Sequence, residues 1–431
     1  MAVRYQYGGL SNTRRTGLSV SECTRRLRRL ACFEEQLMFL QAAHIISSPQ
    51  RDVKALLARL QYEDADHATR IRARLTELRV AQLNLRQSPD TAMSICFAEA
   101  IRSQSSVELI AALARVLKPA LLAAYREYLA ETNTLADYAT VRLLDTVVRE
   151  EQEALELLQA ADGDLADTRE ERSAAETLCA ALAASLKAAG GVLGADEHDR
   201  EGQIENDAEP SEPPRGAYEI PRQLTRDDAF PRVWDIEHVT NDRVPERLAQ
   251  MIATRLGEVT IAEALGCLLY ETQGQPWSFY ADISRHLWDE MRHSLFGEAA
   301  AEEALGERSA MPLRDWESAY LFDMPPLELY AMLAGVESGL MKYPPGKREE
   351  FEFCRDKARH PLMATFQDFD WADEVLHVQI SRRQLKDWFP GTADELRALG
   401  ERGLGLRAEA RSRQPPSPLP DLSHTVELGN D

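Results

Sequence analysis

Residues 19–46, SVSECTRRLRRLACFEEQLMFLQAAHII, have the pattern of a long helix. Ser19, with Glu22 three residues later, matches the capping box that begins many helices. Apolar residues then recur three and four positions apart, which is the period of an α-helix. The pattern ends before Pro49, because proline cannot continue a helix. The same period recurs along most of the chain and alternating β-branched runs are rare, so we predict an all-α fold.

The composition excludes several classes of protein. The chain has 431 residues, with 50 Lys and Arg against 71 Asp and Glu, and a formal net charge of −21. This excess of negative charge disfavours binding to nucleic acid, which is itself a polyanion. The most apolar window, 109–125, contains Arg115, Lys118 and Pro119, so we expect no membrane span. The chain shows neither a secretory signal nor a Cys-x-x-Cys pair, so we expect a cytoplasmic protein without disulfides.

The sequence predicts two helical bundles in tandem. The first covers 19–189 and is followed by Gly190 and Gly191. Residues 190–232 are rich in Gly, Pro and acidic residues and poor in large apolar ones, which is typical of a linker. Helical periodicity returns in a second bundle over 233–395. The Pro- and Ser-rich residues 401–431 are predicted to form a disordered tail.

Two segments of the predicted second bundle share a motif. WDEMRH (288–293) and WADEVLH (371–377) both contain Asp-Glu-x-x-His. Residues three apart lie on one face of a helix, so each motif can present a carboxylate and an imidazole to a common point. The candidate ligands are Glu290 with His293 and Glu374 with His377. Dinuclear carboxylate sites in four-helix bundles combine two such motifs with one Glu from each of the other two helices.

Two further glutamates are candidates for those remaining positions. Glu263 lies in IAEALGCLL and Glu337 in AMLAGVESGLM, and a carboxylate buried in such apolar windows needs a cation. Glu258 is the alternative to Glu263, because the geometry of the predicted helical hairpin permits either. We favour Glu263 because its neighbours are more apolar. His286 lies seven residues before His293, and we interpret it as a supporting or core histidine rather than a ligand.

The second half of the chain resembles the ferritin-like superfamily of di-iron or iron/manganese carboxylate proteins. The likeness covers about 243–388, and the run ETQGQPWSFYADISRHLWDEMRHSLFGE (271–298) is similar to uncharacterised bacterial ferritin-like proteins. The resemblance implies that Glu290 or Glu337 is among the bridging carboxylates. It implies a full ligand set of Glu263, Glu290, His293, Glu337, Glu374 and His377.

The predicted first bundle contains a partial version of this pattern. Glu34 and Glu35 lie in its first helix, and Asp64 and His67 form Asp-x-x-His in the second. The fourth candidate helix has no histidine, so we interpret this half as a ferritin-like duplicate without a complete metal site. The alternative is a second metal site completed by carboxylates of that helix, Glu150 and Glu153.

The ligand types indicate redox chemistry. Carboxylates and imidazoles suit iron or manganese, whereas zinc-ribbon and iron–sulfur sites use cysteine. We expect two iron ions, or an iron/manganese pair, and we predict a non-haem di-iron oxidase or monooxygenase that uses O₂ to oxidise a small organic substrate. The chain has no G-x-G-x-x-G fingerprint, so we expect an external electron donor, a reductase or ferredoxin, and we leave a homodimer open. The alternative is a ferritin-like, iron-handling protein without an organic substrate.

Overall fold

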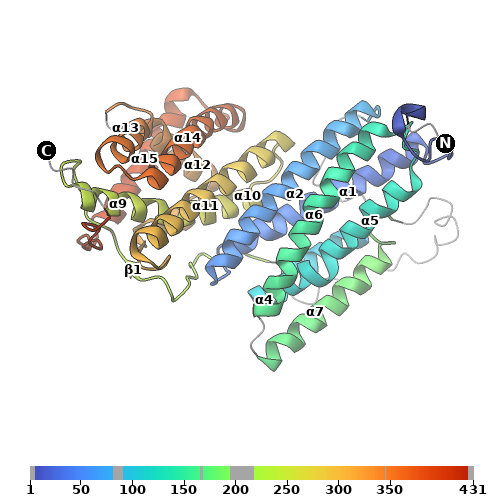
Figure 1. Cartoon of the computed structure of the whole chain (residues 1–431), viewed down its shortest axis with the longest axis horizontal. Helices are drawn as coiled ribbons and strands as arrows, with labels where there is room; N and C mark the ends of the chain where they lie inside the picture. Colours follow the sequence, from blue (N-terminus) through green and yellow to red (C-terminus); the bar gives the residue numbers. More distant parts are fainter. Residues whose placement is uncertain (1–4, 81–90, 166–167, 195–217, 345, 426–431) are drawn as a thin grey trace. The chain divides into compact units, whose positions relative to one another are not determined.

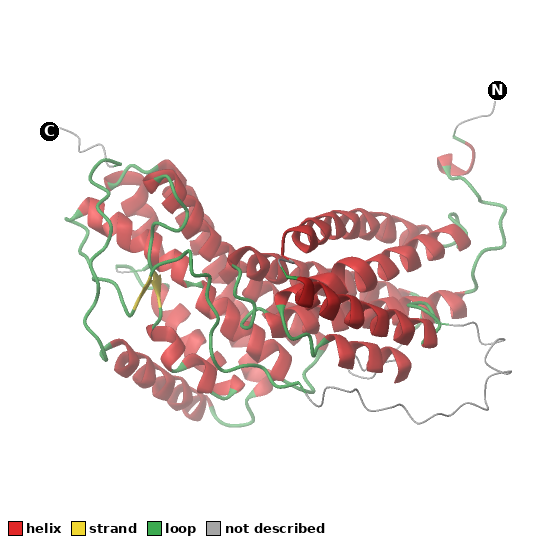
Figure 2. Cartoon of the chain, turned by 90° about the horizontal axis from the view of Figure 1, so that it is seen from below, coloured by secondary structure: helices red, strands yellow, loops and turns green. Residues whose placement is uncertain are grey.

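The computed structural model describes residues 5–80, 91–165, 168–194, 218–344 and 346–425. Its regular structure is almost entirely helical (Figure 2), which confirms the predicted all-α fold. Within these ranges the sheet structure is limited to β1 (Arg232–Val233) and β2 (Leu313–Arg314), which pair in parallel. No helix in the described ranges is both long and apolar enough to cross a membrane.

The chain divides into two compact units. The first comprises Met1–Gln41 and Arg59–Glu219, and the second comprises Ala42–Ala58 and Ile220–Asp431. The sequence instead predicts one continuous bundle over 19–189. The structure differs because residues 42–58 form buried contacts with the second half of the chain, such as the ion pair of Lys54 with Glu263. Part of the predicted linker, 195–217, lies outside the described residues.

Helices build the first unit (Figure 1). Pro119 lies in the first turn of α5, directly after a π turn that continues the helix from α4. Helix α4 packs against α6 and α7, and α5 packs against α6. A 3₁₀ turn (Gln6–Gly9) precedes the helices, and a π turn (Leu113–Leu117) joins α4 to α5. In chain order, the helices are α1 (Val20–His44), α2 (Arg51–Glu77), α3 (Thr91–Ala100), α4 (Ser106–Ala112), α5 (Lys118–Glu131), α6 (Tyr138–Leu165) and α7 (Arg169–Ala188).

The second unit contains the helices that carry both Asp-Glu-x-x-His motifs. Helix α11 packs against α9, α10 and α14, while α12 packs against α14 and α15. Two 3₁₀ turns (Trp316–Ala319 and Leu321–Asp323) precede α12, and a π turn (Phe353–Lys357) follows α13. The helices are α9 (Val244–Gly257), α10 (Val259–Glu271), α11 (Trp277–Leu305), α12 (Pro326–Leu340), α13 (Lys347–Glu352), α14 (Pro361–Trp388) and α15 (Ala393–Arg411).

Helices α9 and α11 approach each other closely at Gly297. A Cβ atom on this residue would lie 2.3 Å from the backbone nitrogen of Leu256, which is closer than real side chains allow. One turn earlier on α11, the Ser294 hydroxyl donates a hydrogen bond to the Leu256 carbonyl. This contact holds the end of α9, where Glu258 lies, beside the α11 motif.

The carboxy-terminal region is more ordered than its composition predicts. Helix α15 extends to Arg411, beyond the predicted start of a disordered tail at 401, and begins with a capping box between Thr392 and Glu395. It packs against α12, and Leu422 is fully buried. Composition alone misses this order because it depends on tertiary contacts. Residues 426–431 of the predicted tail lie outside the described residues.

Candidate metal centre

Buried carboxylates and imidazoles gather between the helices of the second unit in two adjacent groups. In each group the four residues can offer one ligand atom each, and these atoms lie within 4.8 Å of one another. Seven of the eight side chains are buried, and Glu258 is the most exposed, with 12 % of its side chain accessible. We call the groups half-site A (His286, Glu290, Glu337 and His377) and half-site B (Glu258, His293, Asp370 and Glu374).

Helical periodicity explains how α11 and α14 supply six of these residues. Each helix carries ligand-type residues at positions i, i+4 and i+7, which lie on one face. On α11 these are His286, Glu290 and His293, and on α14 they are Asp370, Glu374 and His377. Each Glu-x-x-His motif divides its two side chains between the half-sites. The two motifs therefore join the half-sites into one buried cluster.

Half-site A consists of two histidines and two glutamates in close contact. His286 Nε2 lies 3.0 Å from Glu337 Oε1 and 3.4 Å from Glu290 Oε1. His377 Nδ1 lies 3.5 Å from the same Glu290 oxygen. The rings of His286 and His377 stack with their centroids 3.8 Å apart. Four side chains from three helices thus converge on one small volume.

Half-site B contains the same ligand types together with two protein cations. His293 Nδ1 lies 3.4 Å from Asp370 Oδ1. Lys347 Nζ donates to both Asp370 oxygens at 2.9 Å, and it also lies 2.9 Å from Glu374 Oε1. Arg255 contacts Asp370 as well. Lys347 and Arg255 therefore pair with carboxylates of half-site B, while Glu258 Oε2, Glu374 Oε2 and His293 Nδ1 have no hydrogen-bond partner.

Glu290 lies between the two half-sites. Its Oε1 faces His377 Nδ1 at 3.5 Å, and its Oε2 faces His293 Nδ1 at 3.9 Å. A carboxylate with one oxygen towards each half-site has the arrangement that a bridging ligand needs. Glu290 is one of the two residues, with Glu337, that the resemblance names as candidates for a bridge.

The aspartate that precedes each motif glutamate supports the histidine of the other motif. Asp289 Oδ2 lies 3.4 Å from His377 Nε2, and Asp373 Oδ2 lies 3.3 Å from His293 Nε2. A carboxylate on one ring nitrogen fixes the tautomer and leaves the other nitrogen available to a metal ion. Nδ1 of both histidines faces the cluster, so these aspartates orient the imidazoles for coordination.

Unpaired buried atoms test whether the residues fit a metal ion. In half-site A, Nδ1 of His286, Nδ1 of His377 and Oε2 of Glu337 have no hydrogen-bond partner. Buried polar groups without partners are costly, and they are rare in native proteins. A metal ion would satisfy such atoms at once, because imidazole nitrogens and carboxylate oxygens are its ordinary ligands. The donor set of half-site A therefore fits a transition-metal ion.

The carboxylates also change the pKa values of groups in the cluster. Burial alone would lower the pKa of His286, but the charge of Glu337 raises it to about 10. Burial likewise opposes protonation of His293, but Asp370 raises its pKa to about 9. Burial raises the pKa of Glu258 to about 8. The charge balance of the cluster thus depends on protons when no metal ion is bound.

The structure places five of the six predicted ligands in this cluster and brings Glu258 there in place of Glu263. Glu263 is fully buried on α10, but its Oε1 lies 2.6 Å from Lys54 Nζ and also contacts Arg226. The expectation that Glu263 needs a cation is consistent with this geometry, in which the protein supplies the charge. The apolar neighbours indicated that Glu263 is buried, but they did not indicate which cation it meets.

Sequence reasoning ranked His286 as a supporting residue and did not consider Asp370. Both lie four residues before a motif glutamate, so they share a helix face with it. The pattern His-x-x-x-Glu-x-x-His on α11 is matched by Asp-x-x-x-Glu-x-x-His on α14. Extending the motif by one helical turn towards the amino terminus would have found both residues.

The first unit has one further cluster, formed by Glu34, Asp64, His67 and Glu151. Lys118 is fully buried inside it, contacting Asp64 and lying 2.8 Å from Glu151 Oε1. Of the two alternative ligands, Glu150 lies at the edge of the cluster, with its Oε2 3.0 Å from His67 Nε2. Glu153 is exposed. The structure therefore shows ligand-type residues here, arranged around a lysine.

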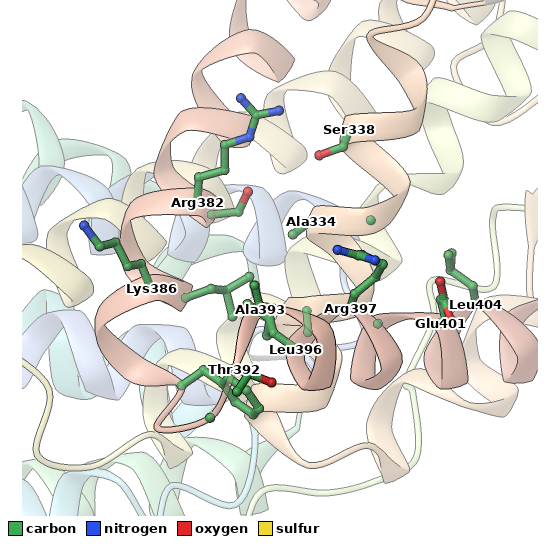
Figure 3. Close-up of a pocket in the computed structure, with 17 residues that line it drawn as sticks. Ala334, Ser338, Arg382, Lys386, Thr392, Ala393, Leu396, Arg397, Glu401 and Leu404 are labelled. Carbon is green, nitrogen blue, oxygen red and sulfur yellow. The ribbon is translucent and has the colours of Figure 1, made fainter.

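A cavity of about 550 Å³ opens between α12, α14 and α15 (Figure 3). Ala334 and Ser338 line it from one face of α12, whereas Glu337 lies on a different face of that helix. Arg382, Lys386 and Arg397 add positive charge to a mostly apolar lining. No residue of half-site A or B is among the described residues that line it. The cavity is thus separate from the candidate metal centre.

In comparisons with known proteins, no family model, no curated protein and no solved structure matches this chain. The ferritin-like resemblance therefore stays a prediction from the sequence.

Proposed function

We propose that the second unit binds a redox-active metal ion, iron first and manganese as the alternative, and uses it for the O₂-dependent oxidation of a small organic substrate. The ferritin-like relationship, the tandem-bundle organisation and the need for an external electron donor belong to the same proposal. The observation that carries it is half-site A, where two histidines and two glutamates converge without a hydrogen-bond partner for several of their buried atoms.

The donor set supports a redox metal over the common alternatives. Magnesium and calcium favour sites made of oxygen ligands, and structural zinc sites usually contain cysteine. A mixed imidazole and carboxylate set suits iron and manganese. None of the six cysteines belongs to the cluster.

The chain's own residues would prepare this centre for reaction. Bound iron supplies one-electron chemistry and a binding site for O₂. Asp289 holds the His377 ring so that Nδ1 faces the cluster, and Glu290 and Glu337 supply negative charge that holds a cation in place. Burial of all four side chains of half-site A keeps bulk water away from the centre.

Metal content tests the first part of the proposal. The full-length protein would be loaded with Fe(II) without oxygen, desalted and analysed by plasma mass spectrometry. We expect the wild type to retain iron and the double variant His286→Ala/His377→Ala to lose it, because both imidazoles of half-site A are removed. His238→Ala is the matched control, since it removes an exposed histidine outside the cluster and should leave the iron content unchanged.

Oxygen consumption tests the second part. Iron-loaded wild type should consume O₂ faster when a chemical reductant and a suitable organic compound are both present, and it should form an oxidised product. Oxidation of the bound iron alone, without an organic product, would favour the iron-handling alternative. Equal iron in the wild type and the double variant would contradict a metal centre at half-site A.

A further inference from the structure

Half-site B already contains a buried positive charge among its carboxylates. The Lys347 side chain is 1 % exposed, and its ammonium is within 2.9 Å of oxygens on both Asp370 and Glu374. Arg255 adds a second cation, with contacts to Asp370 and, at 3.1 Å, to Glu258. Three carboxylates in this half-site therefore face two permanent protein cations.

Half-site A has a different charge environment. In the described chain, the ion-pair partners of Glu290 and Glu337 are histidines. An imidazole can give up its proton and become a metal ligand, whereas a lysine ammonium or an arginine guanidinium in an ion pair offers no lone pair to a metal ion. The two half-sites therefore differ in the partners of their carboxylates, which are histidines in half-site A and include a lysine and an arginine in half-site B.

The first unit shows the same arrangement independently. Lys118 is fully buried and lies between Asp64 and Glu151 within a cluster that also contains Glu34 and His67. The contacts match those of Lys347, where one ammonium again joins two acidic side chains. In this chain, a buried lysine recurs as the cation of a ligand-type cluster.

We propose that the second unit binds a single metal ion, at half-site A, and that the Lys347 ammonium takes the place of a second ion at half-site B. The inference rests on the proposed metal binding at half-site A. A metal ion lies roughly 2 Å from its carboxylate oxygens, and the Lys347 ammonium contacts the same oxygens of Asp370 and Glu374. The two cations cannot occupy half-site B together, because each needs those oxygens and the same space.

Manganese provides a direct count of the ions. Full-length wild type and Lys347→Leu would be loaded with Mn(II) without oxygen and desalted, followed by plasma mass spectrometry and electron paramagnetic resonance. We expect about one ion per chain and the signal of an isolated Mn(II) in the wild type. Removing the ammonium leaves Asp370 and Glu374 without their shared cation, so Lys347→Leu should bind about twice as much and show an exchange-coupled pair.

Lys54→Leu is the matched control. It removes another buried lysine that contacts a buried carboxylate, Glu263, outside the cluster, and it should leave the manganese content and the signal unchanged. Two ions or a coupled pair in the wild type would overturn the inference, even if Lys347→Leu fails to fold. One ion in a folded Lys347→Leu, verified by circular dichroism, would also overturn it. No metal in any variant would instead contradict the proposed function.

Discussion

Buried carboxylates in this chain meet different cations at different positions. Glu263 faces a lysine and an arginine, and Asp370 also faces one of each. Glu337 faces a histidine. A buried charge without a partner is costly, so each of these carboxylates must be neutralised in some way. At the residue scale, the carboxylates of half-site A differ from those of half-site B in that their ion-pair partners in the described chain are histidines.

The placement of Glu263 leads to a prediction that separates stability from metal binding. Glu263→Gln leaves the buried ammonium of Lys54 and guanidinium of Arg226 without a negative partner, so we expect the free energy of unfolding to fall by about 3 kcal/mol. Metal content should not change, because Glu263 lies outside both half-sites. Calorimetry and plasma mass spectrometry, both on the folded protein, measure the two effects.

The exposed Glu302→Gln on the same unit is the control for this prediction, with an expected change within about 0.5 kcal/mol. Loss of metal in a folded Glu263→Gln protein would show that Glu263 is a ligand. Glu258→Gln should also leave the metal content unchanged, because Glu258 belongs to half-site B, and loss of metal in that variant would contradict a single ion at half-site A.

At the scale of elements, two helices provide most of the candidate centre. Helices α11 and α14 each present three ligand-type residues on one face, and the aspartate of each motif orients a histidine of the opposite helix. The remaining ligands come from the end of α9 and from α12. The distance between α9 and α11 therefore decides whether Glu258 can reach half-site B.

Gly297 is the position that sets this distance, and it allows a test. Gly297→Ala would place a methyl group against the backbone of Leu256, so the two helices must separate or distort. We expect a loss of about 2 kcal/mol in the free energy of unfolding, which is typical of overpacking and can be measured by chemical denaturation.

Gly339→Ala on α12 is the matched helical control, because a Cβ atom there meets no atom within 4 Å. It should be neutral or stabilise by up to about 1 kcal/mol, since alanine favours the helix. Equal stability changes in the two variants would show that the close approach at Gly297 is not a constraint.

At the scale of the whole molecule, the second unit is assembled from two separate segments of the chain. Residues Ala42–Ala58 belong to it although they lie between the first two helices. Arg51 pairs with Glu298, and Lys54 pairs with Glu263, and all four side chains are buried. A fragment that starts after the predicted linker would lack these partners.

Cleavage of the intact protein tests this assembly. A protease site inserted within 195–217 would be cut in the folded full-length chain, and the products analysed by size-exclusion chromatography. We expect the two fragments to elute together, because Ala42–Ala58 packs within the second unit through buried ion pairs. Separation of the fragments without denaturant would show that the second half is complete by itself.

The sequence by itself determined the features that depend on local periodicity. A helix repeats every 3.6 residues, so apolar spacing was sufficient to predict the all-α class and to place each glutamate on the face of its motif histidine. The same rule, applied one helical turn towards the amino terminus, places His286 and Asp370 on the same faces as the motif glutamates. These properties follow from neighbours in the chain.

Only the tertiary structure decided which cation each buried carboxylate meets. Lys54 lies 209 residues from Glu263, and Lys347 lies 23 residues from Asp370, so no local pattern shows that they pair. The unit boundary within α1 and α2 and the order beyond 401 depend on long-range packing in the same way. Burial creates the need for a positive charge, but the fold selects whether a lysine, an arginine or a metal ion supplies it.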